Sequence, residues 1–188
     1  MLDAAEELLR QGGSDAVTVE AVIDRAGTST GAFYARFGSR QGLLVAMHER
    51  FLATFREPLI EAATEALERH NLRDAMHTFV EGVVVSVRRH RNTFLFHTVH
   101  NAHEADMRAQ GNELTQGLAL LVERIVDTYR TDAVPMEADR VDMTSRVLHA
   151  FALQLMLFDD DEVTGKSITV DQMIDRFTEM CVSYLTQT

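Results

Sequence analysis

The chain has few of the residues that interrupt helices or cross-link folds. Among its 188 residues are one cysteine, two prolines and no tryptophan. Because Cys181 is alone, it cannot form an intramolecular disulfide, and the prolines at Pro58 and Pro135 leave long stretches without a helix breaker. Alanine, leucine, glutamate, arginine and methionine, which favour helices, dominate the remainder. The composition therefore predicts an all-α protein that is long enough to bury a core.

Targeting and membrane segments are also lacking. The start, MLDAAEE, has neither the basic residues nor the apolar stretch of a secretory signal. The best apolar run, residues 150–158, is interrupted by Gln154, whereas a membrane-spanning helix needs about 20 apolar residues. We therefore expect a cytoplasmic protein with no membrane partner.

Positive charge is scarce, so its placement matters more than its sum. The net charge is −11, and the first 50 residues hold five arginines and seven carboxylates. None of these carboxylates lies in residues 26–47, which contain Arg36 and Arg40. Only charges within a Debye length of about 8 Å of a phosphate act strongly on it. This cationic window is suited to DNA, and we expect modest affinity with a steep salt dependence.

The window lies within a pattern typical of a helix-turn-helix. In TVEAVIDRAGTSTGAFYARFGSRQGLL, two short apolar-periodic segments, residues 18–26 and 29–35, meet around Gly27. Glycine at this point allows the positive φ that a tight inter-helix turn requires. The second segment begins with small residues, which let its backbone approach base edges in a major groove. It is the candidate reading helix.

These residues resemble the signature that opens the tetracycline-repressor (TetR/AcrR) family of bacterial regulators. The likeness rests on AG with a serine two positions on, then FYARF, GSR and LL, and it covers roughly the first 50 residues. The chain has Val22 and Ile23 where the family has Ile-Ala, Thr28 where it has Val, and Arg40 where it has Lys. Ile23 is expected to push the two helices slightly apart. The chain also starts without the basic arm that usually precedes the first helix of family members.

The resemblance implies an organisation and a mode of action. It implies a DNA-binding domain of three helices in residues 1–45 and a helical ligand-binding and dimerisation domain in residues 46–188, with about nine helices in all. It further implies a homodimer, a palindromic double-stranded DNA operator, and repression that a small molecule relieves. Neither a catalytic motif nor a cofactor is expected, so the chain is not interpreted as an enzyme.

The predicted DNA contacts fall into two groups. The residues expected to face the groove are Thr28, Ser29, Thr30, Gly31 and Phe33. The residues expected to hold phosphates are Thr18, Tyr34, Arg36, Arg40 and Gln41.

Capping residues mark where helices of this region begin. We expect a first helix over residues 2–10, and Thr18 as the N-cap of the second. Thr28 or Ser29 would cap the third, and Ser39 would start a fourth that runs to about residue 70. Pro58 lies inside this fourth helix and predicts a kink or a break.

Beyond residue 70 the pattern indicates a series of amphipathic helices. They are placed at residues 72–89, 92–103, 105–130, 137–158 and 169–186. Apolar stripes on the last two helices predict a dimer interface that comprises Val147, Phe151, Leu155, Phe158, Phe177, Cys181 and Tyr184. The proposed ligand pocket comprises Phe79, Val83, Phe94, His97, His100, Met107, Leu114, Leu118 and Phe151. Nine methionines and ten phenylalanines favour a lipophilic ligand with a polar end.

Some features admit other interpretations. His97, His100 and Glu104 share one helical face, so a helical metal-binding protein or enzyme is the alternative, although the HExxH arrangement is absent. A third interpretation keeps the DNA-binding dimer and makes the body a pure oligomerisation module. The basic residues 88–91 are interpreted as a solvated helix end. Cys181, on the inward face of the last helix, is expected to be an inert buried thiol.

Overall fold

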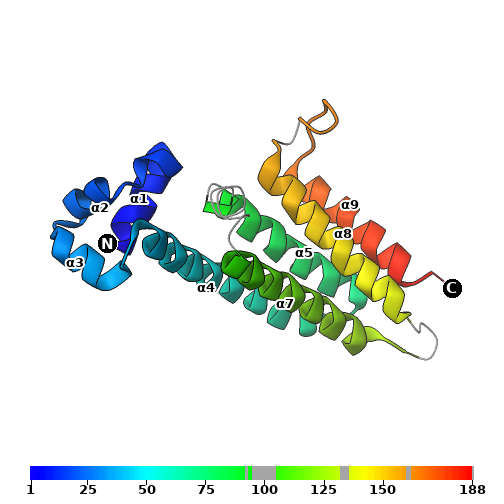
Figure 1. The fold of residues 1–188 in the computed structure, drawn as a ribbon. Helices are drawn as coiled ribbons and strands as arrows, with labels where there is room; N and C mark the ends of the chain where they lie inside the picture. Colours follow the sequence, from blue (N-terminus) through cyan, green and yellow to red (C-terminus); the bar gives the residue numbers. More distant parts are fainter. Residues whose placement is uncertain (92, 95–104, 132–135, 160–161, 188) are drawn as a thin grey trace. The chain divides into compact units, whose positions relative to one another are not determined.

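The computed structural model describes residues 1–91, 93–94, 105–131, 136–159 and 162–187, and its regular elements there are helices (Figure 1). In chain order these are α1 (Leu2–Gly12), a short 3-10 turn (Ser14–Ala16), α2 (Val19–Ala26), α3 (Thr30–Phe37), α4 (Arg40–Leu67), α5 (Leu72–Arg89), α7 (Ala105–Tyr129), α8 (Ala138–Leu157) and α9 (Val170–Leu185). The all-α prediction is confirmed. The predicted bounds of the later helices differ from these by a residue or two, and the predicted helix at 92–103 lies almost wholly outside the described residues.

The chain forms two compact units. The first comprises Met1–Thr54 and Asn92–Gly111, and the second comprises Phe55–Arg91 and Asn112–Thr188. By compactness the division falls inside α4, after Thr54. The division of function at residues 45 and 46 stays a prediction.

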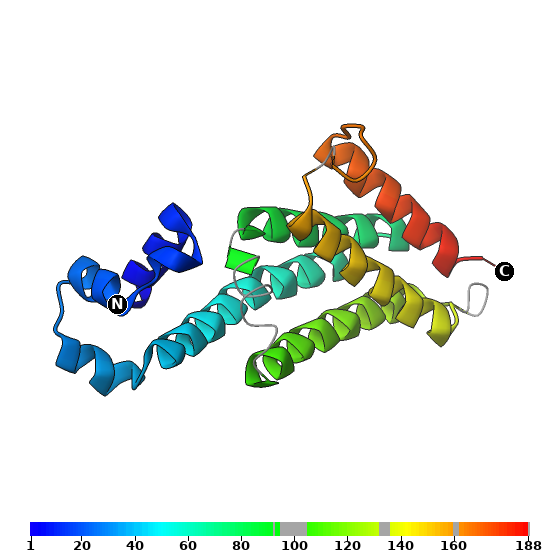
Figure 2. The ribbon, with the colours of Figure 1, turned by 45° about the horizontal axis from the view of Figure 1, so that its top comes forward.

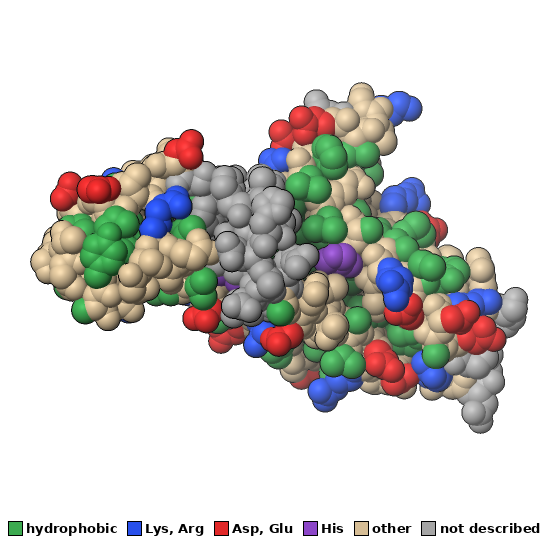
Figure 3. All heavy atoms as spheres, in the orientation of Figure 1, with side chains coloured by type: hydrophobic (Ala, Val, Ile, Leu, Met, Phe, Trp, Pro, Cys, Tyr) green, Lys and Arg blue, Asp and Glu red, His purple; other side chains and the backbone are tan. Residues whose placement is uncertain are grey.

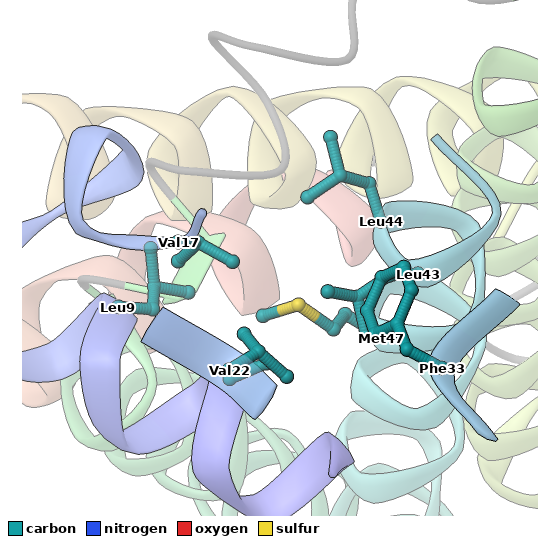
Figure 4. Packing of buried hydrophobic residues seen from close by; sticks show 8 residues of the cluster. Leu9, Val17, Val22, Phe33, Leu43, Leu44 and Met47 are labelled. Carbon is teal, nitrogen blue, oxygen red and sulfur yellow. The ribbon is translucent and has the colours of Figure 1, made fainter. Parts of the chain in front are cut away.

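A small apolar core holds the N-terminal helices of the first unit together. Side chains from α1, α2, α3, α4 and the segment before α2 converge on one centre (Figure 4). The buried members are Ala5, Leu9, Val17, Val22, Phe33, Leu43, Leu44 and Met47. Within this core, α2 and α3 contribute a single buried side chain each, Val22 and Phe33.

Helix α4 continues through Pro58 without ending, so of the predicted kink or break, the break is wrong (Figures 1 and 2). A proline removes one backbone N–H and crowds the carbonyl four residues earlier, which here belongs to Thr54. Buried side chains continue on both sides of the proline, with Phe55 before it and Leu59 after it. This packing maintains the helix where local propensity alone would interrupt it.

In the second unit, α5 packs against α9 and α8, and α8 also packs against α9 (Figure 2). The buried face of α5 includes Phe79, Val80 and Val83. At Gly82 on α5 an added Cβ would overlap the Cβ of Ala62 on α4, so only glycine allows this close approach. The wide apolar contact between long helices is the main stabilising feature of this unit.

Polar contacts fix the ends of these helices. The Tyr129 hydroxyl lies 3.0 Å from the Ala66 carbonyl oxygen and 2.7 Å from that of Arg69, at the end of α4. A guanidinium N–H of Arg140 on α8 donates to the Tyr184 carbonyl near the end of α9, at 3.2 Å. These donors bind carbonyl groups in or just after the last turns of α4 and α9, where helical partners run out.

Within the described ranges, no helix is both long enough and apolar enough to cross a membrane.

Candidate nucleic-acid interface

Hydroxyl side chains cap three successive helices of the first unit. The Thr18 hydroxyl oxygen accepts the Ala21 N–H at 3.1 Å before α2, and that of Ser29 accepts the Ala32 N–H at 3.2 Å before α3. Before α4, the Ser39 hydroxyl oxygen accepts an N–H at 3.0 Å. The predicted cap at Thr18 is confirmed, Ser39 caps the helix that it was expected to start, and of the two candidates for α3 the structure selects Ser29. Each cap satisfies an N–H group that a short helix leaves open at its start.

Two glycines terminate the helices of this motif. Gly27 follows α2 in the left-handed conformation, with φ 59° and ψ 41°, as predicted for the turn between α2 and α3. The next amide, that of Thr28, donates to the Ile23 carbonyl at 3.1 Å. Gly38 follows α3 with φ 69°, and its N–H donates to the Tyr34 carbonyl at 2.9 Å. The reading helix is therefore bounded on both sides by turns that only glycine adopts without strain.

Helix α3 has one buried side and one exposed side. Phe33 is 0% exposed and belongs to the core, and Phe37 is half-buried, with ring centroids 5.3 Å apart. The expectation that Phe33 faces the groove is therefore wrong, because the apolar side of this short amphipathic helix is turned inward. Tyr34 is 49% exposed, and its ring meets Phe33 edge-on at 5.4 Å.

The exposed side of α3 carries most of the residues predicted to face the groove. Ser29, Thr30 and Gly31 are exposed, and Thr28 is half-buried. A Cβ added to Gly31 would find only the Ser29 hydroxyl oxygen within 4.0 Å. The glycine is therefore not required by packing, and it leaves bare backbone at the surface where another molecule can approach closely.

Arg36 and Arg40 differ in what they do inside the unit. Arg36 is exposed, and its guanidinium carbon lies 5.4 Å from the Phe37 ring centroid. The Arg40 Nε donates to the Val17 carbonyl at 3.0 Å, which ties the start of α4 to the residue before the α2 cap. Arg40 thus has a positioning role that the sequence analysis missed. A bond between residues so far apart leaves no local pattern to find.

Gly42 is a second feature that the sequence analysis missed. A Cβ at this position would overlap the Phe37 carbonyl oxygen, so the first turn of α4 approaches the last turn of α3 through glycine alone. Gln41, beside it, is exposed. The orientation of α3 on α4 therefore depends on this contact between backbones.

The remaining arginines of the first 54 residues meet polar or acidic partners. Arg50 pairs with Asp3 at 2.5 Å and with Glu6 at 3.2 Å. Burial raises the pKa of the Glu6 carboxyl, an effect that Arg50 partly offsets. Arg25 donates to the Gln11 side-chain oxygen at 3.0 Å, and Arg10 pairs with Glu7 on α1.

Arg36 and Arg40 have no carboxylate partner among the described residues, which leaves their charge available to an external anion. They lie next to the exposed side of α3. A neutral, backbone-exposing surface flanked by cationic groups is suited to a DNA groove and its phosphates.

Comparison with known families agrees with this geometry. Residues 1–47 match the model of the bacterial regulatory proteins of the tetR family. Over these residues the chain is similar to the tetR family. The match covers α1, α2, α3 and the start of α4, which are the elements that form the surface described above. The resemblance to TetR-family transcriptional regulators is confirmed.

Solved structures extend the likeness over the whole chain. A protein of unknown function from Rhodococcus sp. RHA1 is 20% identical, with a TM-score of 0.74 over 99% of this chain and 93% of its own. A TetR/AcrR regulator from Thermobifida fusca YX-ER1 is 19% identical, with a TM-score of 0.66 over 96% and 93%. PfmR from Thermus thermophilus, a TetR-family regulator, is 19% identical, with a TM-score of 0.61 over 99% and 98%. At this identity the likeness shows a common fold. Among curated proteins, none matches the chain.

The residues of the proposed ligand pocket lie in varied surroundings. Phe79 and Val83 are fully buried in the second unit, and Phe94 packs edge-on against Phe51 with centroids 4.6 Å apart. Leu118 is buried and Leu114 half-buried on α7. His97, His100 and the side chain of Met107 lie outside the described residues. The pocket as a whole stays a prediction.

The predicted dimer residues divide into buried and exposed members. Leu155, Phe177 and Cys181 are buried within the chain, so they belong to its core and are not accessible to a second copy. Phe158 and Tyr184 are exposed. Val147 and Phe151 are half-buried, and the Phe151 ring stacks on Phe177 with centroids 4.1 Å apart. The predicted stripes are apolar faces of α8 and α9, but the residues on the inner side of each stripe pack within the chain.

The other candidate chemistry concerns the Cys181 thiol and a metal site. Burial raises the pKa of the Cys181 thiol to about 12, which agrees with the interpretation of an inert thiol. In the part of the chain that the structure describes, no three His, Cys, Asp or Glu side chains could hold a metal together. His97, His100 and Glu104 lie outside that part.

Proposed function

We propose that the chain is a DNA-binding transcriptional regulator that reads a palindromic operator as a homodimer and releases it when a small lipophilic effector binds. The observation that carries the DNA-binding part is the exposed side of α3, with Gly31 open and Arg36 beside it, in a domain of the TetR family. This surface has the size and chemistry of a helix that enters a major groove.

Each exposed residue has a distinct role in the proposed contact. Ser29, Thr30 and the Gly31 backbone face the base edges. The Tyr34 hydroxyl and the Arg36 guanidinium donate to phosphates on either side of the groove. The Thr18 hydroxyl accepts the Ala21 N–H as a cap, and its own hydrogen remains available for a phosphate. Arg40, with its Nε on Val17, offers its terminal N–H groups.

The proposed dimer uses the exposed outer parts of α8 and α9. Large apolar side chains are exposed there, including Met143 and Phe158 on or next to α8, and Met180 and Tyr184 on α9. Figure 3 shows apolar patches over these two helices. A twofold arrangement covers the same patch on both protomers and places two reading helices about 34–36 Å, or a multiple of it, apart.

The proposed effector acts through α4, the single helix that starts beside the reading helix and ends in the second unit. A lipophilic molecule in the proposed ligand pocket would favour one position of α4 and change the spacing of the two reading helices. Only a ligand with unequal affinity for the two states can produce this effect.

The direct test is selection of genomic DNA fragments by the purified protein at two salt concentrations. The proposal predicts enrichment of a short palindrome whose recovery falls steeply at the higher salt, as expected when phosphate contacts supply much of the affinity. An enriched site without twofold symmetry would contradict the homodimer. A lack of any enriched sequence at either salt concentration would contradict the reading role of α3.

A further inference from the structure

A cavity of about 490 Å³ lies in the second unit, where the ends of α5 and α8 meet the segment that joins α8 to α9. Its volume is within the range of about 300–1,000 Å³ that is typical of small-molecule sites. One part of its wall is charged, with Arg88, Arg91 and Asp159. The two arginines belong to the basic residues 88–91, which the DNA-binding surface does not use.

Arg91 is held in a fixed orientation at this wall. Its Nε donates to the Met156 carbonyl near the end of α8 at 2.9 Å, and its Nη1 donates to the Asp159 carboxylate at 2.6 Å. Among the described residues, these are the acceptors found for its five N–H groups. A planar guanidinium fixed in this way is ready for a second carboxylate, because little side-chain entropy is lost when it binds.

The rest of the wall is apolar. Leu155, Phe158 and Ile168 line it, together with the small polar side chain of Ser167. Leu155 is buried, whereas Phe158 and Ile168 are both partly open to solvent. An apolar wall opposite a fixed cationic group is the arrangement that binds a molecule with a negative head and a short hydrocarbon body.

We propose that this cavity binds a small amphipathic carboxylic acid, with its carboxylate on Arg91 and Arg88 and its hydrocarbon part against Leu155, Phe158 and Ile168. Asp159 already binds Nη1 of Arg91 and lies beside the remaining N–H groups, so its negative charge competes with the carboxylate of the ligand. The site is independent of the DNA-binding surface and of the proposed effector pocket.

The competition gives a test in which two variants change the affinity in opposite directions. Octanoate is titrated into the full-length protein by isothermal calorimetry, with octan-1-ol as the uncharged match. Arg91→Gln is expected to weaken octanoate binding about tenfold or more, because a charge-assisted bond is lost. Asp159→Asn is expected to tighten it several-fold. Arg89→Gln, a neighbouring arginine that does not line the cavity, is the matched control and leaves the affinity unchanged.

Several results would overturn the proposal. Octan-1-ol that binds as tightly as octanoate, or octanoate binding that Asp159→Asn weakens, would contradict the role of the charged wall. If octanoate binds all variants with equal affinity, its binding site is not this cavity but another one, such as the proposed effector pocket. Absence of measurable octanoate binding would also contradict the proposal. Should Arg91→Gln fail to fold, Arg88→Gln and Asp159→Asn decide the outcome. None of these results depends on whether the protein binds DNA.

Discussion

The helices of the two units are stabilised in different ways. In the first unit, α2 and α3 have eight residues each, and each begins at a hydroxyl cap and ends at a glycine with positive φ. In the second unit, α5 has 18 residues and α9 has 16, and each buries a long apolar stripe against its neighbours. Isolated helices as short as α3 are unstable in water, so caps and a few core side chains determine whether they form.

This difference explains why the first unit can present a specific surface. The core of the first unit uses only Phe33, with the half-buried Phe37, from α3, and the rest of that helix is exposed. Apart from the cap Ser29, the residues on the exposed side, such as Thr30, Gly31 and Arg36, are small or polar and do not belong to the core. In the second unit α5, α8 and α9 each bury a continuous apolar face, so the large apolar side chains that stay exposed stand out as contacts for another molecule.

The largest expected effect comes from removing the one fully buried side chain of α3. Phe33→Ala leaves a cavity in a core of eight buried residues and should reduce the free energy of unfolding of this unit by about 3–5 kcal/mol. Chemical denaturation followed by circular dichroism measures it. Tyr34→Ala, on the exposed side of the same helix, is the control and should change stability by about 0.5 kcal/mol or less. Equal losses for the two variants would show that α3 is oriented differently.

The caps provide the next test of the comparison. Ser29→Ala removes the acceptor of the Ala32 N–H and should cost about 1 kcal/mol. Because α3 is so short, we also expect faster hydrogen exchange along the whole helix. Thr169→Ala, which removes the cap of the longer α9, should speed exchange only in its first turn. Ser29→Asn retains an acceptor and should behave like the wild type. Unchanged exchange in Ser29→Ala would show that packing alone maintains α3.

Substitution of Gly31 should change stability and DNA affinity in opposite directions. Gly31→Ala adds a methyl group into open space and should stabilise α3 by up to about 1 kcal/mol, because alanine is the better helix former. The same methyl group lies where base edges are expected, so operator affinity should fall. Thermal unfolding and a DNA titration of one preparation measure both effects. A variant that is more stable and binds DNA as tightly as the wild type would exclude Gly31 from the interface.

The smallest effect concerns a single histidine of α8. Burial lowers the pKa of His149 below its ordinary value of 6.5, so the folded state favours the neutral ring. When the pH falls below about 6.5, the unfolded chain binds a proton that the folded chain does not, and stability decreases. His149→Gln should remove this part of the pH dependence, as measured by urea unfolding between pH 7 and pH 5. An identical pH dependence in the variant would contradict the assignment.

Local chemistry explains what could be predicted from the sequence. The caps at Thr18 and Ser39 and the turn at Gly27 were predictable because each depends on residues three or four positions away. The orientation of Phe33 was not, because a helix of two turns offers too few apolar positions to mark its inner side. The hydrogen bond from Arg40 to the Val17 carbonyl joins residues that are far apart in the chain, so no local sequence pattern predicts it.

The second unit shows a different limit of prediction from sequence. Periodicity correctly identified the apolar faces of α8 and α9. It could not separate Cys181, which is 3% exposed, from Tyr184, which is 37% exposed, because both lie on the same broad stripe. The division depends on the position of α5 against α9, which is set by tertiary packing.

The salt dependence of DNA binding tests the central claim most directly. The enriched fragment is titrated with wild type, Arg36→Gln and, as control, Arg89→Gln on α5, over a series of salt concentrations. If α3 lies in the groove with Arg36 on a phosphate, Arg36→Gln weakens binding and reduces the slope of log affinity against log salt by about 1, while Arg89→Gln matches the wild type. If all three proteins share one slope and one affinity, α3 does not bind DNA as proposed.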